Sequence, residues 1–272
     1  MKIRLNSFIT GVFILMAVLP PIVTQTLADD PVGRAIMEKV DARDDGDNQT
    51  SDMEMILIDK RGKKRIRRIA SYRKDKGDDT MRLMFFIHPA DVKDTSFLTS
   101  DYDDPSKDDD QWLYLPALRK SKRIASTDKS GSFMGSDLNY SDMTDRNLPD
   151  YDFNLKKEMA VKGAKTWLIE SIPRTKKVIK ETGYKKSLIF VRQDNYVVIR
   201  AVHGEKDGGY LKYVDLKELE LIDSVWVATE THVSRKKGKQ LVHNTDLKLN
   251  NIKFNQNLDN ELFSVRRMEK GL

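Results

Sequence analysis

Most of the chain after residue 50 alternates between apolar and polar residues, which is typical of strands with one buried face. From Met53 to Leu57 and from Met81 to Ile87 every second residue is apolar, and Arg82 marks the opposite, solvated face. This periodicity predicts ten strands rich in β-branched and aromatic residues. They cover residues 51–59, 64–72, 80–88, 111–115, 166–172, 187–193, 196–202, 211–219, 224–233 and 240–254.

Turn-forming residues separate these segments, so the strands are expected to form consecutive antiparallel hairpins. A long antiparallel sheet must hide its edges, which favours a barrel-like or strongly bent sheet. A helix is predicted over Pro31–Val40, where proline suits the first turn, and it could lie inside the curve. Residues 85–87 and 189–191 are apolar on both faces, so these two strands are expected to lie between the interior and another layer.

The stretch from residue 89 to residue 149 departs from the alternating pattern. Residues 91–110 contain eight aspartates and two lysines, and residues 121–145 are dense in Ser, Asp, Gly and Lys. Both regions are predicted to be long loops, which in compact domains are usually functional or disordered. Phe133 and Leu138 provide apolar anchors in the second loop, which favours docking over pure disorder.

Residues 1–28 have the pattern of a secretory leader. A basic start precedes an uncharged apolar run, and the segment ends at the small residue Ala28. A transmembrane anchor is the alternative, but Pro20 and Pro21 interrupt a run too short to cross about 30 Å of hydrocarbon. Lipid attachment is excluded because the chain has no cysteine. We therefore expect cleavage after Ala28 and a soluble single β domain over residues 29–272, exported to the periplasm.

Composition excludes several functional classes. The formal net charge is +6 and charges of both signs are interleaved, so no nucleic-acid partner is expected. The absence of cysteine removes thiolate metal sites and thiol nucleophiles. The four histidines show no metal-ligand spacing, and neither a GxSxG elbow nor a phosphate-binding loop is present. We expect a protein that is not an enzyme and that needs no cofactor or metal.

Two questions remain open at this level. The aspartates of residues 101–110 could bind calcium, although the loop lacks the glycine and the terminal glutamate of an EF-hand, which favours a solvated acidic loop. The apolar inner face, with its methionines and phenylalanines, could fill an ordinary core or enclose an apolar ligand. The spacing of the residues does not decide between them.

The central block and the C-terminus contain more specific motifs. They are PADV (89–92), TSFL (95–98), DQWLYLPAL (110–118), RI (123–124), SFMGSD (132–137) and ELFSV (261–265). In these motifs the chain resembles the outer-membrane lipoprotein-sorting family, LolA-like periplasmic proteins often associated with transporters of the resistance-nodulation-division (RND) class. The resemblance covers nearly the whole mature chain and departs from the family at Asp94, where glycine is frequent, which should alter only a local turn.

The resemblance implies a mainly β fold with few helices, an incomplete antiparallel β-barrel of the LolA/LolB type whose concave face is covered by a helix and loops. It also implies a non-enzymatic, monomeric periplasmic carrier or transporter accessory protein that shelters the acyl chains of a lipid or lipoprotein, with an inner-membrane RND-class transporter as partner. A lipid- or stress-sensing regulatory module of the same fold and an envelope-polymer hydrolase are the alternatives.

On this interpretation six side chains line or gate the cavity, and SFMGSD is either a lid or a structural turn. For each side chain the alternative is an ordinary core position. The six are Met55, Leu57, Phe85, Trp112, Tyr114 and Phe133.

Overall fold

The computed structural model describes residues 29–272, so the predicted leader lies outside the described part of the chain. In residues 29–272, thirteen antiparallel strands form one sheet, accompanied by three α-helices and short 3-10 turns. The helices are α1 (Pro31–Asp41), α2 (Lys176–Thr182) and α3 (Val265–Lys270). The strands are β1 (Asn48–Asp59), β2 (Lys64–Lys76), β3 (Asp79–His88), β4 (Ser96–Asp101), β5 (Asp110–Leu115), β6 (Lys120–Arg123), β7 (Tyr151–Val161), β8 (Ala164–Pro173), β9 (Tyr184–Arg192), β10 (Val198–Glu205), β11 (Tyr210–Ile222), β12 (Val225–Lys237) and β13 (Gln240–Phe254).

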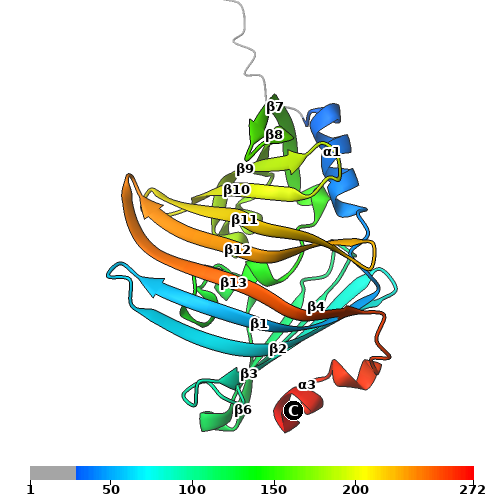
Figure 1. Ribbon diagram of the computed structural model, residues 1–272, viewed down its shortest axis with the longest axis vertical. Helices are drawn as coiled ribbons and strands as arrows, with labels where there is room; N and C mark the ends of the chain where they lie inside the picture. The colour runs from blue at the N-terminus through cyan, green and yellow to red at the C-terminus, as the bar shows by residue number, and fades with distance from the viewer. Residues whose placement is uncertain (1–28) are drawn as a thin grey trace, which may run out of the picture.

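The strand order makes the sheet an incomplete barrel. Strands pair with their sequence neighbours from β1 to β6 and from β7 to β13, and β1 also pairs with β13. This last pairing joins the two runs and leaves β6 and β7 as the two edges. Figure 1 shows the sheet curving around the green segment that connects β6 to β7. The open, curved antiparallel sheet expected from the sequence is confirmed.

All ten predicted strands are present, and three more lie where none was predicted: β4, β6 and β7. The prediction of a loop over residues 91–110 was wrong for β4. Residues 96–99 of this strand are buried on both faces, so the Ser and Thr side chains show no exposed polar side. The pattern of β7 is broken by a bulge between Leu155 and Lys157, which shifts its alternation by one residue.

Helix α1 covers the edge strand β7 and forms as predicted. Asp30 caps the helix by accepting a hydrogen bond from the Val32 N–H. The Asp30 N–H donates to the Phe153 carbonyl, and the Asp30 carboxylate accepts from the Leu155 N–H. These contacts satisfy backbone groups of β7 that would otherwise be free to pair with another chain. Ile36, one turn further along, is buried against the inner face of the sheet.

Strand β3 lies between two layers, as its doubly apolar pattern predicts. Phe86 faces the inside of the curve. Its neighbour Phe85 faces the outside, where it forms a cluster with Phe263 and with Met268 of α3. The C-terminal helix therefore covers the outer face of the same strands whose inner face forms the main core (Figure 1).

The contact between α1 and β7 leaves no room for a side chain at Gly33. A Cβ atom there would lie 2.9 Å from both the Leu155 nitrogen and the Phe153 oxygen. We expect Gly33→Ala to lower the free energy of unfolding by about 1–3 kcal/mol, because backbone atoms must shift. Urea denaturation measures this, with Val32→Ala on the exposed face of α1 as the control. A Gly33→Ala protein more stable than wild type, as helix propensity alone predicts, would contradict this close approach.

Candidate functional site

The concave face of the sheet has an apolar floor. It is built by inward-facing residues of six strands, and each is at most 7% exposed. The pairing of β1 with β13 brings Val233 of β12 to the floor residues of β1 to β5. The floor residues are Met55, Leu57, Ile69, Met84, Phe86, Phe97, Leu113 and Val233.

The floor is covered by residues 129–143, which we call the plug segment. Its central side chain, Phe133, is 0% exposed, and its ring centroid lies 4.9 Å from that of Phe97 and 6.3 Å from that of Phe86. Tyr140 of the same segment packs edge-on against Phe133 at 5.6 Å. Leu138 and Met143 are also buried in this cluster. The plug segment therefore supplies the apolar groups that fill the concavity.

The tip of the plug segment is a tight turn. The Phe133 N–H donates to the Leu138 carbonyl at 2.7 Å, and Ser132 forms a bridge with Asn139. Between them Met134 and Gly135 have φ angles of 51° and 73°, which lie in the left-handed region. Glycine adopts this conformation without strain, which explains Gly135 of the SFMGSD motif, whereas Met134 adopts it although it carries a Cβ atom.

A polar contact holds the tip against β13. The carboxylate of Asp137 is 2.6 Å from His243 Nδ1 and accepts a hydrogen bond from the Thr245 hydroxyl at 2.8 Å. The Thr245 oxygen in turn accepts from the Asp137 N–H at 3.0 Å. Asp137 and Thr245 are both buried, so these bonds replace hydration that the plug segment loses when it docks.

A second anchor is a buried ion pair near the other end of the plug segment. The Lys212 ammonium, 2% exposed, lies 3.0 Å from Asp142 Oδ2 and also donates to the side-chain oxygen of Asn139. The Tyr184 hydroxyl donates to the same Asp142 carboxylate at 2.9 Å. Asp142 therefore ties the plug segment to β9 and β11.

The protonation states in this anchor follow from burial and charge. Burial raises the pKa of Asp142, but the charge of Lys212 and smaller contributions, among them the hydrogen bond from the Asn139 N–H, together lower it more, so the net pKa lies below the ordinary value. The ring of His203 stacks on that of Tyr184 at 4.6 Å, and burial, reinforced by the charge of Arg146, holds the pKa of His203 well below its ordinary range. Burial, and then Asp142, raises the pKa of Tyr184 well above its ordinary value. At neutral pH the anchor thus holds an ionised carboxylate and a neutral histidine.

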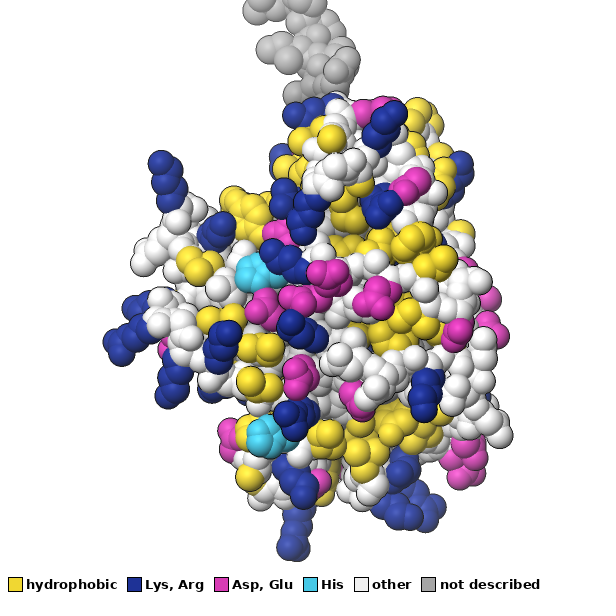
Figure 2. Space-filling view, viewed as in Figure 1, with side chains coloured by type: hydrophobic (Ala, Val, Ile, Leu, Met, Phe, Trp, Pro, Cys, Tyr) yellow, Lys and Arg dark blue, Asp and Glu magenta, His cyan; other side chains and the backbone are white. Residues whose placement is uncertain are grey.

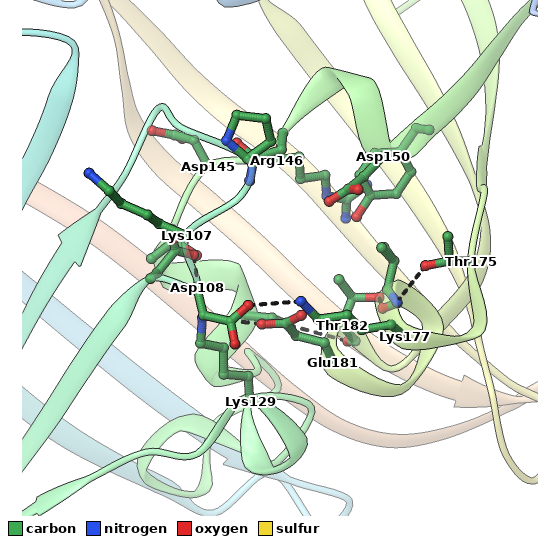
Figure 3. A pocket seen from close by; sticks show the side chains of 17 residues that line it. Lys107, Asp108, Lys129, Asp145, Arg146, Asp150, Thr175, Lys177, Glu181 and Thr182 are labelled. Carbon is green, nitrogen blue, oxygen red and sulfur yellow. Dashed lines mark hydrogen bonds and ion pairs between the residues drawn. The ribbon is translucent and has the colours of Figure 1, made fainter.

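The cavities beside the plug segment are polar. One of about 200 Å³ lies where charged side chains of α2, of the plug segment and of the loop before β5 converge (Figure 3). There Asp108 pairs with Lys177 at 2.9 Å and the buried Lys129 pairs with Glu181 at 3.2 Å. A second, of about 670 Å³, is lined by many carboxylates, Asp101 among them. Among residues 29–272, no group of three or more His, Asp or Glu side chains is arranged to hold a metal ion.

The six side chains predicted to line a cavity fall on two faces of the sheet. Met55, Leu57 and Phe133 lie together in the concave cluster. Phe85, Trp112 and Tyr114 lie in the outer cluster beneath the C-terminal segment. The structure thus separates them into two sets that cannot contact one ligand, and the role of each set in ligand binding stays a prediction.

The polar anchors were missed at the sequence level. His243 and Lys212 were not singled out, because a lone polar residue in an alternating strand is usually solvated. Their partners Asp137 and Asp142 lie in a region expected to be a loop, more than sixty residues away in the chain. The one signal in the sequence was the position of Lys212, which lies on the apolar side of its strand and is followed by Tyr213 and Val214. It identifies a buried cation but not its partner.

The fold and much of the sequence match solved structures. A DUF1329 family protein from Desulfovibrio piger superposes with a TM-score of 0.80 at 28% identity, covering 89% of this chain and 99% of that one. An outer-membrane lipoprotein-sorting protein domain from Vibrio parahaemolyticus gives 0.79 at 29% identity, covering 88% and 98%. A LolA superfamily protein from Nitrosomonas europaea gives 0.64 at 16% identity, covering 86% and 98%, a likeness of fold alone.

A family model described only as "Uncharacterized protein" matches residues 78–270. No curated protein matches the chain. Among the described residues, no helix has the length and apolar character needed to cross a membrane.

The buried pair predicts a large cost for removing its cation. Lys212→Met leaves the Asp142 carboxylate buried and unpaired, so we expect the free energy of unfolding to fall by about 3–5 kcal/mol. Adding Asp142→Asn should recover part of the loss, and urea denaturation of the two single variants and the double variant measures the coupling. The control is Lys186→Met, whose pair with Glu170 involves a lysine that is 53% exposed and should cost about 1 kcal/mol or less. Equal losses in Lys212→Met and Lys186→Met would refute the burial argument.

Asp101 predicts a pH dependence of stability. Burial, and then the charges of Asp145 and Asp109, raise the pKa of Asp101 to about 8. The unfolded chain releases this proton near 3.8, so between about pH 4 and pH 8 the folded state binds more protons and the free energy of unfolding falls as pH rises. The Asp101→Asn protein should not show this decline. Its gain in free energy of unfolding over wild type should therefore be larger near pH 8 than near pH 4. Urea denaturation across the window tests it, with the exposed Asp207→Asn as control. An unchanged slope would exclude Asp101 as its source.

Proposed function

The chain belongs to the LolA-like outer-membrane lipoprotein-sorting family, and from this membership and the site we propose that it is a non-enzymatic carrier of a lipid or lipid-modified cargo. Its binding surface is the concave apolar floor, and the plug segment is the displaceable occupant of that surface. The cargo's acyl chains replace the side chains of the plug segment when it binds.

The observation that carries the proposal is the position of Phe133. This residue belongs to a connecting segment rather than to the sheet, yet it is 0% exposed at the centre of the concave face. An acyl chain gains about 0.8 kcal/mol for each methylene that it buries, so it can compete for the same floor. Met55 and Met84, which have flexible and polarisable side chains, can repack around a linear hydrocarbon.

The anchors of the plug segment suit reversible displacement. Its apolar contacts are non-directional and can be made equally well by a lipid. Its polar contacts, through Asp137 and Asp142, involve groups that water can satisfy once the segment swings out. On this view Met55 and Leu57 contact the cargo, whereas Phe85, Trp112 and Tyr114 support the C-terminal helix on the outer face.

The proposal extends to the compartment and to the partner. The relative from Vibrio parahaemolyticus is described as an outer-membrane lipoprotein-sorting domain, which supports a periplasmic site of action and a lipidated cargo. An export leader over residues 1–28 would deliver the chain there. An inner-membrane transporter of the RND class is the proposed partner that loads or unloads the carrier.

A locked plug segment tests the proposal. The chain has no cysteine, so Asp137→Cys combined with Thr245→Cys places a single thiol pair where the two side chains now touch. We expect the oxidised protein to bind no phosphatidylethanolamine or acylated peptide, and the reduced protein to bind both, as measured by native mass spectrometry. The Asp137→Cys single variant is the control for loss of the anchor, and it should bind at least as much lipid as wild type.

Two results would count against the proposal. If the oxidised and reduced proteins bind lipid equally, the plug segment does not cover the binding surface. If wild type purified from an envelope extract carries no lipid and binds none that is added, the carrier function itself is excluded.

A further inference from the structure

Two neighbouring hairpin tips carry an unusual density of positive charge. Seven of the nine residues from Lys60 to Arg68 in the β1–β2 hairpin are basic, and so are four of the five from Arg235 to Lys239 in the β12–β13 hairpin. The pairing of β1 with β13, which places Asp59 opposite His243, puts the two tips side by side. We call residues 60–68 and 235–239 together the basic rim.

Most of this charge has no internal partner. Arg68 pairs with Glu54 and Arg235 pairs with Glu205. Within residues 29–272, the other nine cations of the basic rim form no ion pair; Arg67 donates to a backbone carbonyl instead, and six of the remaining eight are lysines. These eight are Lys60, Arg61, Lys63, Lys64, Arg65, Lys236, Lys237 and Lys239.

The opposite ends of β1 and β2 are acidic, and so is the connection between β4 and β5 at the same end of the sheet. The connections there are residues 41–47, 77–79 and 102–109, and each contains two or more aspartates. Figure 2 shows Lys and Arg side chains projecting at the left margin, where the hairpin tips lie, while Asp and Glu lie mainly over the centre and right of this face. The small net charge of +6 therefore conceals a separation of charge along the strands.

Exposed aliphatic side chains lie among the cations. Ile66 in the β1–β2 hairpin is 42% exposed, and Leu241, just after the β12–β13 turn, is 37% exposed. Leu211, which lies opposite Lys236 in the sheet, is 36% exposed. They are separated by charged residues. Isolated apolar side chains among cations are typical of proteins that rest on an anionic bilayer, where the apolar groups enter the headgroup region.

The basic rim also contacts the plug segment. The Arg67 guanidinium donates to the Met134 carbonyl at the tip of the plug segment. His243, which holds Asp137, follows the β12–β13 hairpin in β13. A pocket of about 340 Å³ lies beside His243 and is lined in part by Gly135 of the plug segment and Arg235 of the basic rim. A surface that approaches the basic rim therefore also approaches the end of the plug segment.

We propose that the basic rim docks the protein onto an anionic phospholipid surface. Lysines and arginines near such a surface are each attracted to it, and the effects of several side chains add. The number of unpaired lysines favours lipid over an acidic protein, because lysine is depleted at protein–protein interfaces. The docking itself does not depend on cargo binding. Only its purpose, which is to bring the plug segment to the bilayer for exchange, rests on the proposed function.

Vesicle flotation tests the docking. Wild type should bind vesicles of phosphatidylglycerol and phosphatidylcholine in roughly a 3:7 ratio, and should be released when salt is raised from about 0.1 M to about 0.5 M. It should not bind vesicles of phosphatidylcholine alone. Replacing Lys63, Lys64 and Lys239 together by Glu should lower the partition constant more than about tenfold.

The matched control reverses the same charge elsewhere. Lys165, Lys217 and Lys253 are exposed and lie away from the basic rim, so replacing them together by Glu changes the net charge equally. We expect this variant to keep at least about half of the wild-type partition constant. Equal losses in the two triple variants would overturn the proposal, because they would show a net-charge effect. Failure of wild type to bind the anionic vesicles, or binding only to an acidic protein, would overturn it too.

These outcomes are separable from failure of the carrier function. The rim variant should retain the lipid that native mass spectrometry detects on wild type, because the concave floor is unchanged. The oxidised Asp137→Cys and Thr245→Cys protein should still bind anionic vesicles, because residues 60–68 and 235–239 are unchanged. A rim variant that floats like wild type would overturn the docking proposal alone.

Discussion

The burial of the concave apolar face is the constraint on which the rest of the structure depends. The thirteen strands form a curved sheet that does not close into a barrel. The side chains of its inner face alone do not fill the space that the sheet curves around. The chain solves this with the segment between β6 and β7, whose Phe133 and Leu138 complete the core. Core and candidate binding surface are therefore the same set of atoms. A ligand for this surface has to substitute for part of the protein's own core.

The polar contacts of the plug segment have a different role from its apolar ones. The pair formed by Lys212 and Asp142 places two charges in a site with little solvent, and the cost of desolvation offsets much of their attraction. Such a pair contributes little net stability but favours one position of the plug segment, since in any other position each charge loses its partner and needs water in its place. The contact of Asp137 with His243 and Thr245 adds a second fixed point. In the proposed carrier function, lipid would replace the apolar contacts, and the polar contacts would define the position to which the segment returns.

The remaining helices pack away from the floor that the plug segment covers. Helix α1 satisfies backbone groups of the edge strand β7, and α3 covers the outer side of β3 and β4. Because the sheet is supported from outside, the plug segment can leave without exposing both faces of β3. The charge separation along the strands is likewise independent of the packing of the sheet. The basic residues lie at hairpin tips, where they disturb neither the inner nor the outer apolar layer.

The sequence by itself determined the antiparallel sheet, helix α1 and the double burial of β3, because these depend on periodicities of two and on local turns. The family motifs and the basic stretch from Lys60 to Arg68 are also visible in the sequence. That stretch is easily overlooked, because acidic and basic residues alternate over most of the chain. Only the tertiary structure decided which apolar face turns inward. A period of two shows that Phe85 and Phe86 lie on opposite sides, but the direction of curvature assigns Phe86 to the plug segment and Phe85 to α3. It also decided the partners of Lys212 and His243, since such contacts join distant residues through the pairing of β1 with β13 and the path of the plug segment.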